Sequence, residues 1–367
     1  LAAAHAAGAH RPSQAAVPGG AVAIPFDKTG YGYYEMYLNL TYDGAAGKPH
    51  VQLSLGDSGF SALQMCCWGD LDHSKYRVLN DSYKAPFNKT VDAKLVIGSV
   101  ALTDSTGAPY TLRNVTFYAC VTDCDYHGIG LGVGEDYAKG VYSPLSPLGS
   151  AVPPTPRPVV RFDYAHRRLL LYQGQTAAPA CKTSWMGVSK PDEQDFWTCV
   201  KVKQVLVGGR PVENWVTSDT EAFLDTGGLL QYLKWGDDAT EDPFGKPSVN
   251  TPCPRPAFFD DAPDDWKGDS DFKGCVCRYS PEVVFSLADE EGRGVNVTFS
   301  QAGMYGLPKE KGADFTLGET PTLVTCKKAN VGDGNWANLG GSFFMLNDVT
   351  FDYQAKEVCI EPRSAPL

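Results

Sequence analysis

The two halves of the chain carry the same series of motifs, and this repeat limits the possible folds more than any other feature. Each copy contains an Asp-Ser/Thr-Gly motif at the end of an apolar run, then a Gly-rich apolar segment, then a Phe-Asp-Tyr hairpin. The first copy places these at 55–59, 128–134 and 160–172, and the second at 223–227, 339–344 and 349–361. Because the same order occurs twice, the sequence predicts two homologous halves that each present one aspartate at the end of a strand.

The aspartates of the two motifs, Asp57 and Asp225, are the candidate catalytic residues. Two carboxyl groups held close together cannot both ionise easily, so one remains an acid while the other acts as a base. Hydrolysis of an amide by water needs both, because a base activates the water and an acid protonates the departing nitrogen. One such tripeptide alone would be read as an ordinary turn. Its duplication favours a shared catalytic site.

The rest of the sequence predicts an all-β fold. Short β-branched and aromatic runs are separated by Gly, Pro and Asn, and long helical periodicity is scarce. The predicted strands include 33–42, 51–55, 94–102, 114–121, 198–207 and 295–300. With 367 residues the chain is long enough for two lobes, which we place at 21–175 and 176–367, after a flexible Ala/Gly-rich extension at 1–20. The Pro-rich stretch 143–158 is predicted to be a surface loop.

Composition and charge exclude several classes of protein. Hydrophobic residues make up 43% of the chain and charged residues 20%, so the chain is too apolar to be disordered. The formal net charge of -11 makes nucleic acid and anionic lipid poor partners. No apolar run approaches the length of a membrane span. The histidines and cysteines show no metal-ligand spacing, so we expect neither a metal nor a cofactor.

Cysteines and glycosylation sequons predict a secreted protein. The eleven cysteines favour disulfides, and the odd count leaves one thiol free or paired with another chain. Five Asn-x-Ser/Thr sequons are the candidate glycosylation sites, at Asn39, Asn80, Asn88, Asn114 and Asn296. No signal peptide is visible at Leu1, so we expect the sequence to be a processed form.

From about residue 21 to 367 the chain resembles the pepsin family of aspartic peptidases. The resemblance rests on the approach to the second aspartate at 196–227, on 335–353 with its Gly-Gly-Ser-Phe-Phe run, and on 279–285 followed by Cys326. It implies a bilobal pepsin-like fold of two homologous β-barrel lobes with a substrate cleft between them. It also implies a secreted monomer that cleaves peptides, with a disulfide from Cys326 to Cys275 or Cys277.

For the site, the resemblance implies that Asp57 and Asp225 polarise a water and protonate the leaving amine. The hydroxyls of the two motifs would form hydrogen bonds between the lobes, and the glycines would give tight turns with N–H groups near the carboxylates. The residues that support the pair in this way are Ser58, Gly59, Thr226 and Gly227.

Several residues around the motifs depart from the family pattern. A Ser or Thr usually follows each Asp-Thr/Ser-Gly, but here these positions are Phe60 and Gly228, so both hydroxyls are missing. The Trp usually found shortly after the first motif is Gln64. These three residues are candidate cleft residues. Tyr83 is the candidate flap residue, although the Gly that normally follows the flap Tyr is absent.

These departures leave three functions open. The first is a secreted endopeptidase that uses the Asp57/Asp225 pair. The second is a pepsin-like fold that dehydrates, cyclises or isomerises a small molecule by acid–base chemistry. The third is a binding or inhibitor protein without turnover, as in the pepsin-like xylanase inhibitors of plants, and the retention of both motifs argues against it. An acidic insert at 235–271 is predicted to be a solvated loop, with a cleft-side lid as the alternative.

Overall fold

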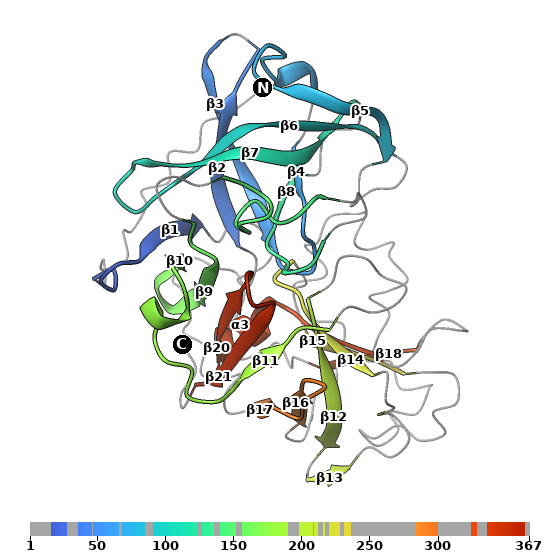
Figure 1. Ribbon diagram of the computed structural model, residues 1–367. Helices are drawn as coiled ribbons and strands as arrows, with labels where there is room; N and C mark the ends of the chain where they lie inside the picture. The colour runs from blue at the N-terminus through green and yellow to red at the C-terminus, as the bar shows by residue number, and fades with distance from the viewer. Residues whose placement is uncertain are drawn as a thin grey trace, which may run out of the picture.

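The computed structural model describes most of the chain, and all that follows is confined to the described residues. These are 16–27, 36–45, 47–65, 68–84, 91–122, 127–135, 140–151, 156–189, 198–207, 209–211, 216, 220–227, 231–235, 283–299, 324–328 and 336–363. Strands dominate them, together with the short helix α3 (Gly341–Leu346) and the 3-10 turns η1 (Trp68–Asp70), η2 (Tyr164–His166) and η3 (Gln175–Ala177) (Figure 1). The prediction of a mostly β fold is confirmed.

The first half forms a closed barrel. Its strands follow one another in the order β2 (Tyr37–Asp43), β3 (Pro49–Asp57), β8 (Gly128–Gly130), β4 (Leu63–Met65), β7 (Pro109–Cys120) and β6 (Asp92–Thr103). A further pairing of β6 with β2 closes the ring, and β5 (Arg77–Lys84) extends it beyond β6. Alternation explains the inner face: Leu38, Leu40 and Tyr42 of β2 are buried, and the residues between them are half-buried.

A shared antiparallel sheet joins the two halves. It consists of β11 (Trp185–Gly187), β21 (Glu357–Pro362), β20 (Asn347–Asp352), β9 (Val159–Asp163), β10 (Arg168–Tyr172) and β1 (Val22–Asp27). Both predicted hairpins are confirmed as β9–β10 and β20–β21, and they pair with each other through β9 and β20. Phe162 of β9 contacts Phe344 of α3 and Phe351 of β20, with ring centroids 5.0 and 4.9 Å away. The hairpins therefore bring the two halves into one hydrophobic core (Figure 1).

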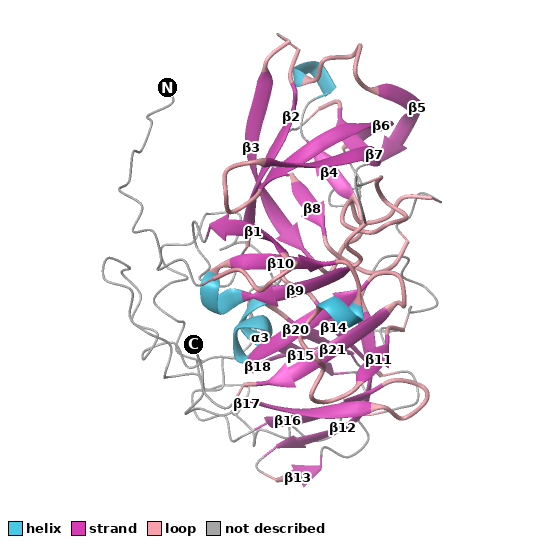
Figure 2. Cartoon of the chain, turned by 60° about the vertical axis from the view of Figure 1, so that its left-hand side comes forward, coloured by secondary structure: helices cyan, strands magenta, loops and turns pink. Residues whose placement is uncertain are grey.

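The second half forms another sheet, of which β12, β13, β16 and β17 lie below the shared sheet in the view of Figure 2. Its order is β17 (Gly294–Phe299), β16 (Val283–Ala288), β12 (Cys199–Val207), β14 (Glu221–Leu224), β19 (Trp336–Leu339), β15 (Gln231–Trp235) and β18 (Val324–Lys328), with β13 (Arg210–Pro211) beside β12.

The sequence repeat is also a repeat of strand pairing. In the first half β3 pairs with β8 in parallel, β8 pairs with β4 antiparallel, and β4 pairs with β7 in parallel. In the second half β14, β19, β15 and β18 make the same three pairings with the same directions. Each motif aspartate therefore lies at the carboxyl end of a strand that pairs with the Gly-rich segment of its own half.

The Pro-rich stretch contradicts the prediction of a surface loop. It contains no helix in its described part, but Ser143, Leu145, Ser146 and Ser150 are buried. A buried loop is tolerated because its polar groups are bonded: Ser143 Oγ donates to Gly130 O, and Ser150 Oγ donates to Pro144 O. The loop is therefore part of the packing behind the Gly-rich segment.

One disulfide is described, between Cys181 and Cys359. It ties the segment after the first hairpin to β21, so the expectation of disulfide bonding is confirmed. Cys275 and Cys277, the expected partners of Cys326, lie outside the described ranges. The acidic insert beyond Trp235 also lies outside them. In the described part of the chain no helix is long and apolar enough to cross a membrane.

Candidate active site

The two motif aspartates lie against each other in the structure. Asp57 ends β3, Asp225 directly follows β14, and both are buried, with 8% and 9% of their surface exposed. A methyl group added at Gly227 would lie 2.4 Å from Asp57 Oδ2, and one added at Gly59 would lie 2.7 Å from Asp225 Oδ1. Each glycine thus faces the carboxyl group of the other half. Only a residue without a Cβ leaves room for this approach.

Four buried hydrogen bonds join the two motifs. The Ser58 N–H donates to Thr226 Oγ1 at 2.9 Å, and the Thr226 N–H donates to Ser58 Oγ at 2.9 Å. The two hydroxyls donate in turn to backbone carbonyls of the opposite half, Ser58 Oγ to Leu224 O at 2.8 Å and Thr226 Oγ1 to Gly56 O at 2.9 Å. The pattern is symmetric, so it fixes the two turns, and the aspartates beside them, relative to each other.

Each carboxylate also accepts a backbone hydrogen bond from its own turn. Gly59 N–H donates to Asp57 Oδ1 at 2.8 Å, and Gly227 N–H donates to Asp225 Oδ1 at 3.0 Å. A further bond breaks the symmetry: Asn338 Nδ2 donates to Asp225 Oδ2 at 2.6 Å. The sequence analysis missed Asn338 as a site residue. The sequence signal that could have found it is the Asn338 side chain between the apolar residues Ala337 and Leu339, in a segment typical of a buried strand.

The pKa of Asp57 is raised well above its ordinary value. Burial is the main cause, and the charge of Asp225 and a hydrogen bond with it act in the same direction. Backbone hydrogen bonds from Gly59 and Gly227 oppose the shift without cancelling it. Ionisation of Asp57 beside Asp225 is therefore unfavourable in this buried site.

The Gly-rich segment of the first half packs directly against the motif and the residues that follow it. A methyl group at Gly130 would lie 2.4 Å from Ala62 N, and one at Gly132 would lie 2.7 Å from Ser61 Oγ. Leu131 N–H donates to Asp57 O at 2.7 Å, and Leu131 O accepts from Tyr353 Oη at 2.7 Å. The second hairpin therefore supports the backbone next to Asp57.

Two of the residues that depart from the family pattern, Phe60 and Tyr83, lie in and beside an apolar cluster. Phe60 is 3% exposed and packs in a cluster with Ala62, Val91, Ala93, Leu95, Tyr118, Cys120 and Val141. Tyr83, near the end of β5, packs against this cluster, with its ring 5.8 Å from that of Tyr118. Gln64 is buried in β4. Phe60 therefore fills part of an apolar cluster at the position where the family pattern has a hydroxyl. Gly228 lies outside the described residues.

The remaining candidates are distributed over the surface and the core. Asn80, Asn114 and Asn296 are exposed, Asn39 is half-buried, and Asn88 lies outside the described residues.

Cys199 is a free, buried thiol, and burial raises its pKa. No group of three or more His, Cys, Asp or Glu side chains in the described ranges is arranged to hold a metal ion.

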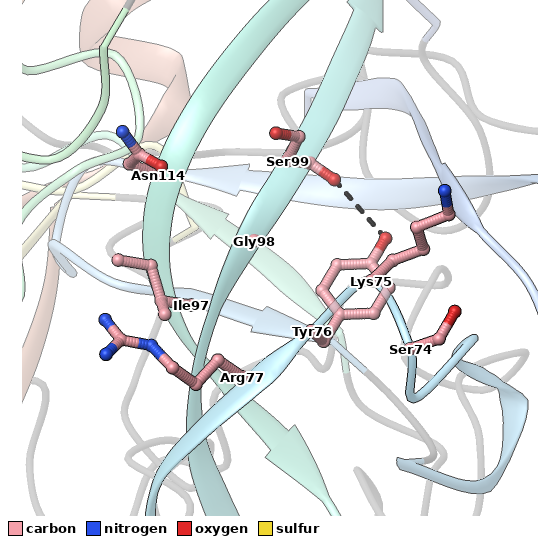
Figure 3. Close-up of a pocket in the computed structure, with 8 residues that line it drawn as sticks. All are labelled: Ser74, Lys75, Tyr76, Arg77, Ile97, Gly98, Ser99 and Asn114. Atoms are coloured by element: carbon pink, nitrogen blue, oxygen red, sulfur yellow. Dashed lines mark hydrogen bonds between the residues drawn. The ribbon is translucent and has the colours of Figure 1, made fainter.

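A cavity of about 330 Å³ opens beside β5 and β6 (Figure 3). Its lining includes no residue of the two Asp-Ser/Thr-Gly motifs. It is lined by Ser74, Lys75, Tyr76, Arg77, Ile97, Gly98, Ser99 and Asn114. Tyr76 Oη donates to Ser99 O at 3.3 Å across its wall. None of these residues contributes to the aspartate pair, so the cavity is separate from the candidate active site.

Comparison with protein-family models and with curated proteins finds no match for this chain.

Proposed function

We propose that the protein is a secreted aspartic endopeptidase with a bilobal pepsin-like fold, in which Asp57 and Asp225 activate water for peptide-bond hydrolysis. One observation carries the proposal: equivalent aspartates of two structural repeats are buried against each other, and reciprocal hydrogen bonds of Ser58 and Thr226 hold their turns together. Turns that merely capped strands would not require glycines facing the opposite carboxyl group.

The geometry supports a division of roles between the two carboxyl groups. Both oxygens of Asp225 accept N–H donors, from Gly227 and Asn338, which favours its charged form, so Asp225 is the base and Asp57 is the acid. Asp225 takes a proton from water as the water oxygen attacks the carbonyl carbon, and Asp57 gives its proton to the carbonyl oxygen. The C–N bond of the resulting diol then breaks as Asp225 passes its proton to the leaving nitrogen. Asp57 recovers its proton from a hydroxyl of the diol, which becomes the new carboxyl group.

Secretion and glycosylation belong to the same proposal. The disulfide between Cys181 and Cys359 fits an oxidising compartment. The exposed sequons at Asn80, Asn114 and Asn296 are accessible for glycosylation.

A second candidate function is acid–base catalysis on a small molecule in the same fold. Phe60 favours it, because the residue next to the first motif is buried in an apolar cluster and supplies no hydroxyl to the carboxylate. A dehydration or isomerisation needs the proton exchange of the pair but not a grip on an extended peptide.

Cleavage of a peptide library tests the proposal. Wild type is expected to cleave at acid pH, about 3 to 5, and a statine-type analogue is expected to block cleavage. Asp57→Asn and Asp225→Asn should both abolish cleavage. Asp92→Asn is the control, since Asp92 is exposed and forms an ion pair with Lys84. No cleavage and no binding of the analogue by wild type would reject the peptidase.

A double substitution distinguishes the two candidates. Phe60→Ser with Gly228→Thr restores both missing hydroxyls. If the double variant cleaves peptides at least tenfold faster than wild type, these positions limit an existing peptidase. If peptide cleavage stays absent while a small-molecule screen gives a turnover that Asp57→Asn abolishes, the second candidate replaces the first.

A further inference from the structure

We propose that Asn338 is a positioning residue that holds Asp225 as the charged member of the pair and thereby assigns the proton to Asp57. The proposal rests on the aspartate pair described under the proposed function. Asn338 is 1% exposed, and its Nδ2 lies 2.6 Å from Asp225 Oδ2. The other oxygen of the same carboxylate accepts the Gly227 N–H, so both oxygens of Asp225 have a donor.

Strand pairing explains why this side chain reaches the site. β19 pairs with β14 in parallel, with Asn338 opposite Phe223 and Leu339 opposite Leu224. Asp225 N–H donates to Leu339 O at 3.1 Å, so the backbone of the aspartate lies beside the end of β19. The neighbours of Asn338 on this strand, Ala337 and Leu339, are buried and apolar. A buried amide N–H in such a strand is costly unless it is hydrogen-bonded, and the Asp225 carboxylate provides that bond for Asn338 Nδ2.

The equivalent strand position of the first half carries no side-chain donor. Its pairing places Gly56 opposite Ile129 and Leu55 opposite Gly128, so Gly128 occupies the position of Asn338. A glycine has no side chain to donate to Asp57. Neither Phe60 nor Gly228 carries a side-chain donor. Asp57 interacts with the backbone N–H groups of Gly59 and Gly227, whereas Asp225 accepts from the Gly227 N–H and from the side-chain amide of Asn338 at 2.6 Å. Asn338 thus adds a side-chain donor on the Asp225 side.

This asymmetry has a direct consequence for the charge distribution. An amide N–H stabilises a carboxylate more than a neutral carboxyl group, because the bond to a charged acceptor is the stronger one. With one proton for two carboxyl groups, the negative charge stays on Asp225 and the proton on Asp57. The charged groups around Asp225 in the described part of the chain do not reverse this: Asp57 faces it directly, and Glu221 at the start of β14 is paired with Lys201 at 3.3 Å.

Asn338→Leu tests the proposal, because leucine keeps the volume and removes the donor. We expect kcat to fall at least about tenfold, with KM within about twofold, and the acid limb of the pH profile to move up by about one pH unit. Asn347→Leu is the matched control. Asn347 is also buried, and its Nδ2 donates to Phe343 O at 2.9 Å, far along the chain from both motifs. The control should lose stability but keep the pH profile of wild type.

A titration that does not depend on activity separates this proposal from the peptidase itself. The carboxyl signals of protein labelled with ¹³C-aspartate are followed against pH, with Asp57→Asn and Asp225→Asn to assign the pair. The lower titration step of the pair should move up by about one pH unit in Asn338→Leu. If that variant does not fold, Asn338→Ala also removes the amide donor without adding a titrating group, and should shift the step in the same direction.

The outcomes are distinct. An unchanged titration in a folded Asn338 variant overturns the proposal, even when both Asp→Asn variants abolish cleavage. A shifted titration in a protein that cleaves no peptide supports the role of Asn338 and rejects the peptidase.

Discussion

Gly227→Ala should disable the active site through a contact with the opposite half. The methyl group of the alanine would lie 2.4 Å from Asp57 Oδ2 and 2.5 Å from Asp57 Cγ. The backbone of Gly227 does not need a left-handed conformation, since the positive-φ glycines are other residues. The substitution therefore acts on Asp57 by steric contact, without direct strain in its own turn.

The size of the effect follows from these distances. Non-bonded heavy atoms reach favourable contact at about 3.5 to 4.0 Å, so the carboxyl group of Asp57 must withdraw by about 1 Å. A displacement of about 1 Å at reacting groups costs about 100-fold in rate, or about 2.7 kcal/mol in activation free energy. Overpacking of a buried site lowers the free energy of unfolding by about 1 to 3 kcal/mol, so the variant should remain folded under mild conditions.

The assay is kcat/KM on a peptide that wild type cleaves, with urea denaturation of the same samples. Gly59→Ala is the reciprocal variant, because its methyl group would lie 2.7 Å from Asp225 Oδ1, and it should show a similar loss. Gly134→Ala is the control, since no atom lies within 4 Å of its added methyl group. A Gly227→Ala enzyme within threefold of wild type would refute the close approach of the two carboxyl groups.

Three further predictions concern stability and reactivity. Thr226→Val removes the bonds to Ser58 N and Gly56 O, so the free energy of unfolding should fall by about 2 to 5 kcal/mol in urea denaturation. Asp57→Asn should raise the free energy of unfolding at pH 7, because folding raises the pKa of Asp57 and its ionisation therefore opposes folding. This gain should shrink as the pH falls and vanish below about pH 4, where Asp57 is protonated in both states. Cys199 should resist alkylation in the native protein and react once it is unfolded, as measured by peptide mass spectrometry, because its thiol is buried and its pKa is raised.

Each of these has a result that contradicts it. Thr176→Val, at an exposed position in η3, should change the free energy of unfolding by no more than about 0.5 kcal/mol. If Thr226→Val changes it equally little, the reciprocal hydrogen bonds do not stabilise the fold. A gain for Asp57→Asn that grows toward low pH would contradict the raised pKa. Rapid native alkylation of Cys199 would show that it is accessible.

The local pattern of the sequence was enough to predict several elements of the fold. Short β-branched and aromatic runs at 33–42 and 198–207 predicted strands that the structure contains as β2 and β12, because such residues favour extended backbone. The two Phe-Asp-Tyr segments predicted the hairpins at 160–172 and 349–361, since a polar turn between apolar runs favours this structure. The Pro-rich stretch was predicted correctly to lack helix in its described part, but the burial of Ser143–Ser146 was missed, because proline content reports the absence of helix and not the exposure of a loop.

The sequence by itself determined the repeat, and with it the two strands that end in Asp57 and Asp225, because motif order and apolar alternation are properties of neighbouring residues. Tertiary structure alone decided which groups surround these carboxylates. Asn338 lies 113 residues from Asp225 in the chain and reaches it only through the parallel pairing of β14 with β19. Phe60 is buried in its cluster because β6 and β7 fold over it. Such contacts depend on strand register between distant segments, which no local pattern specifies.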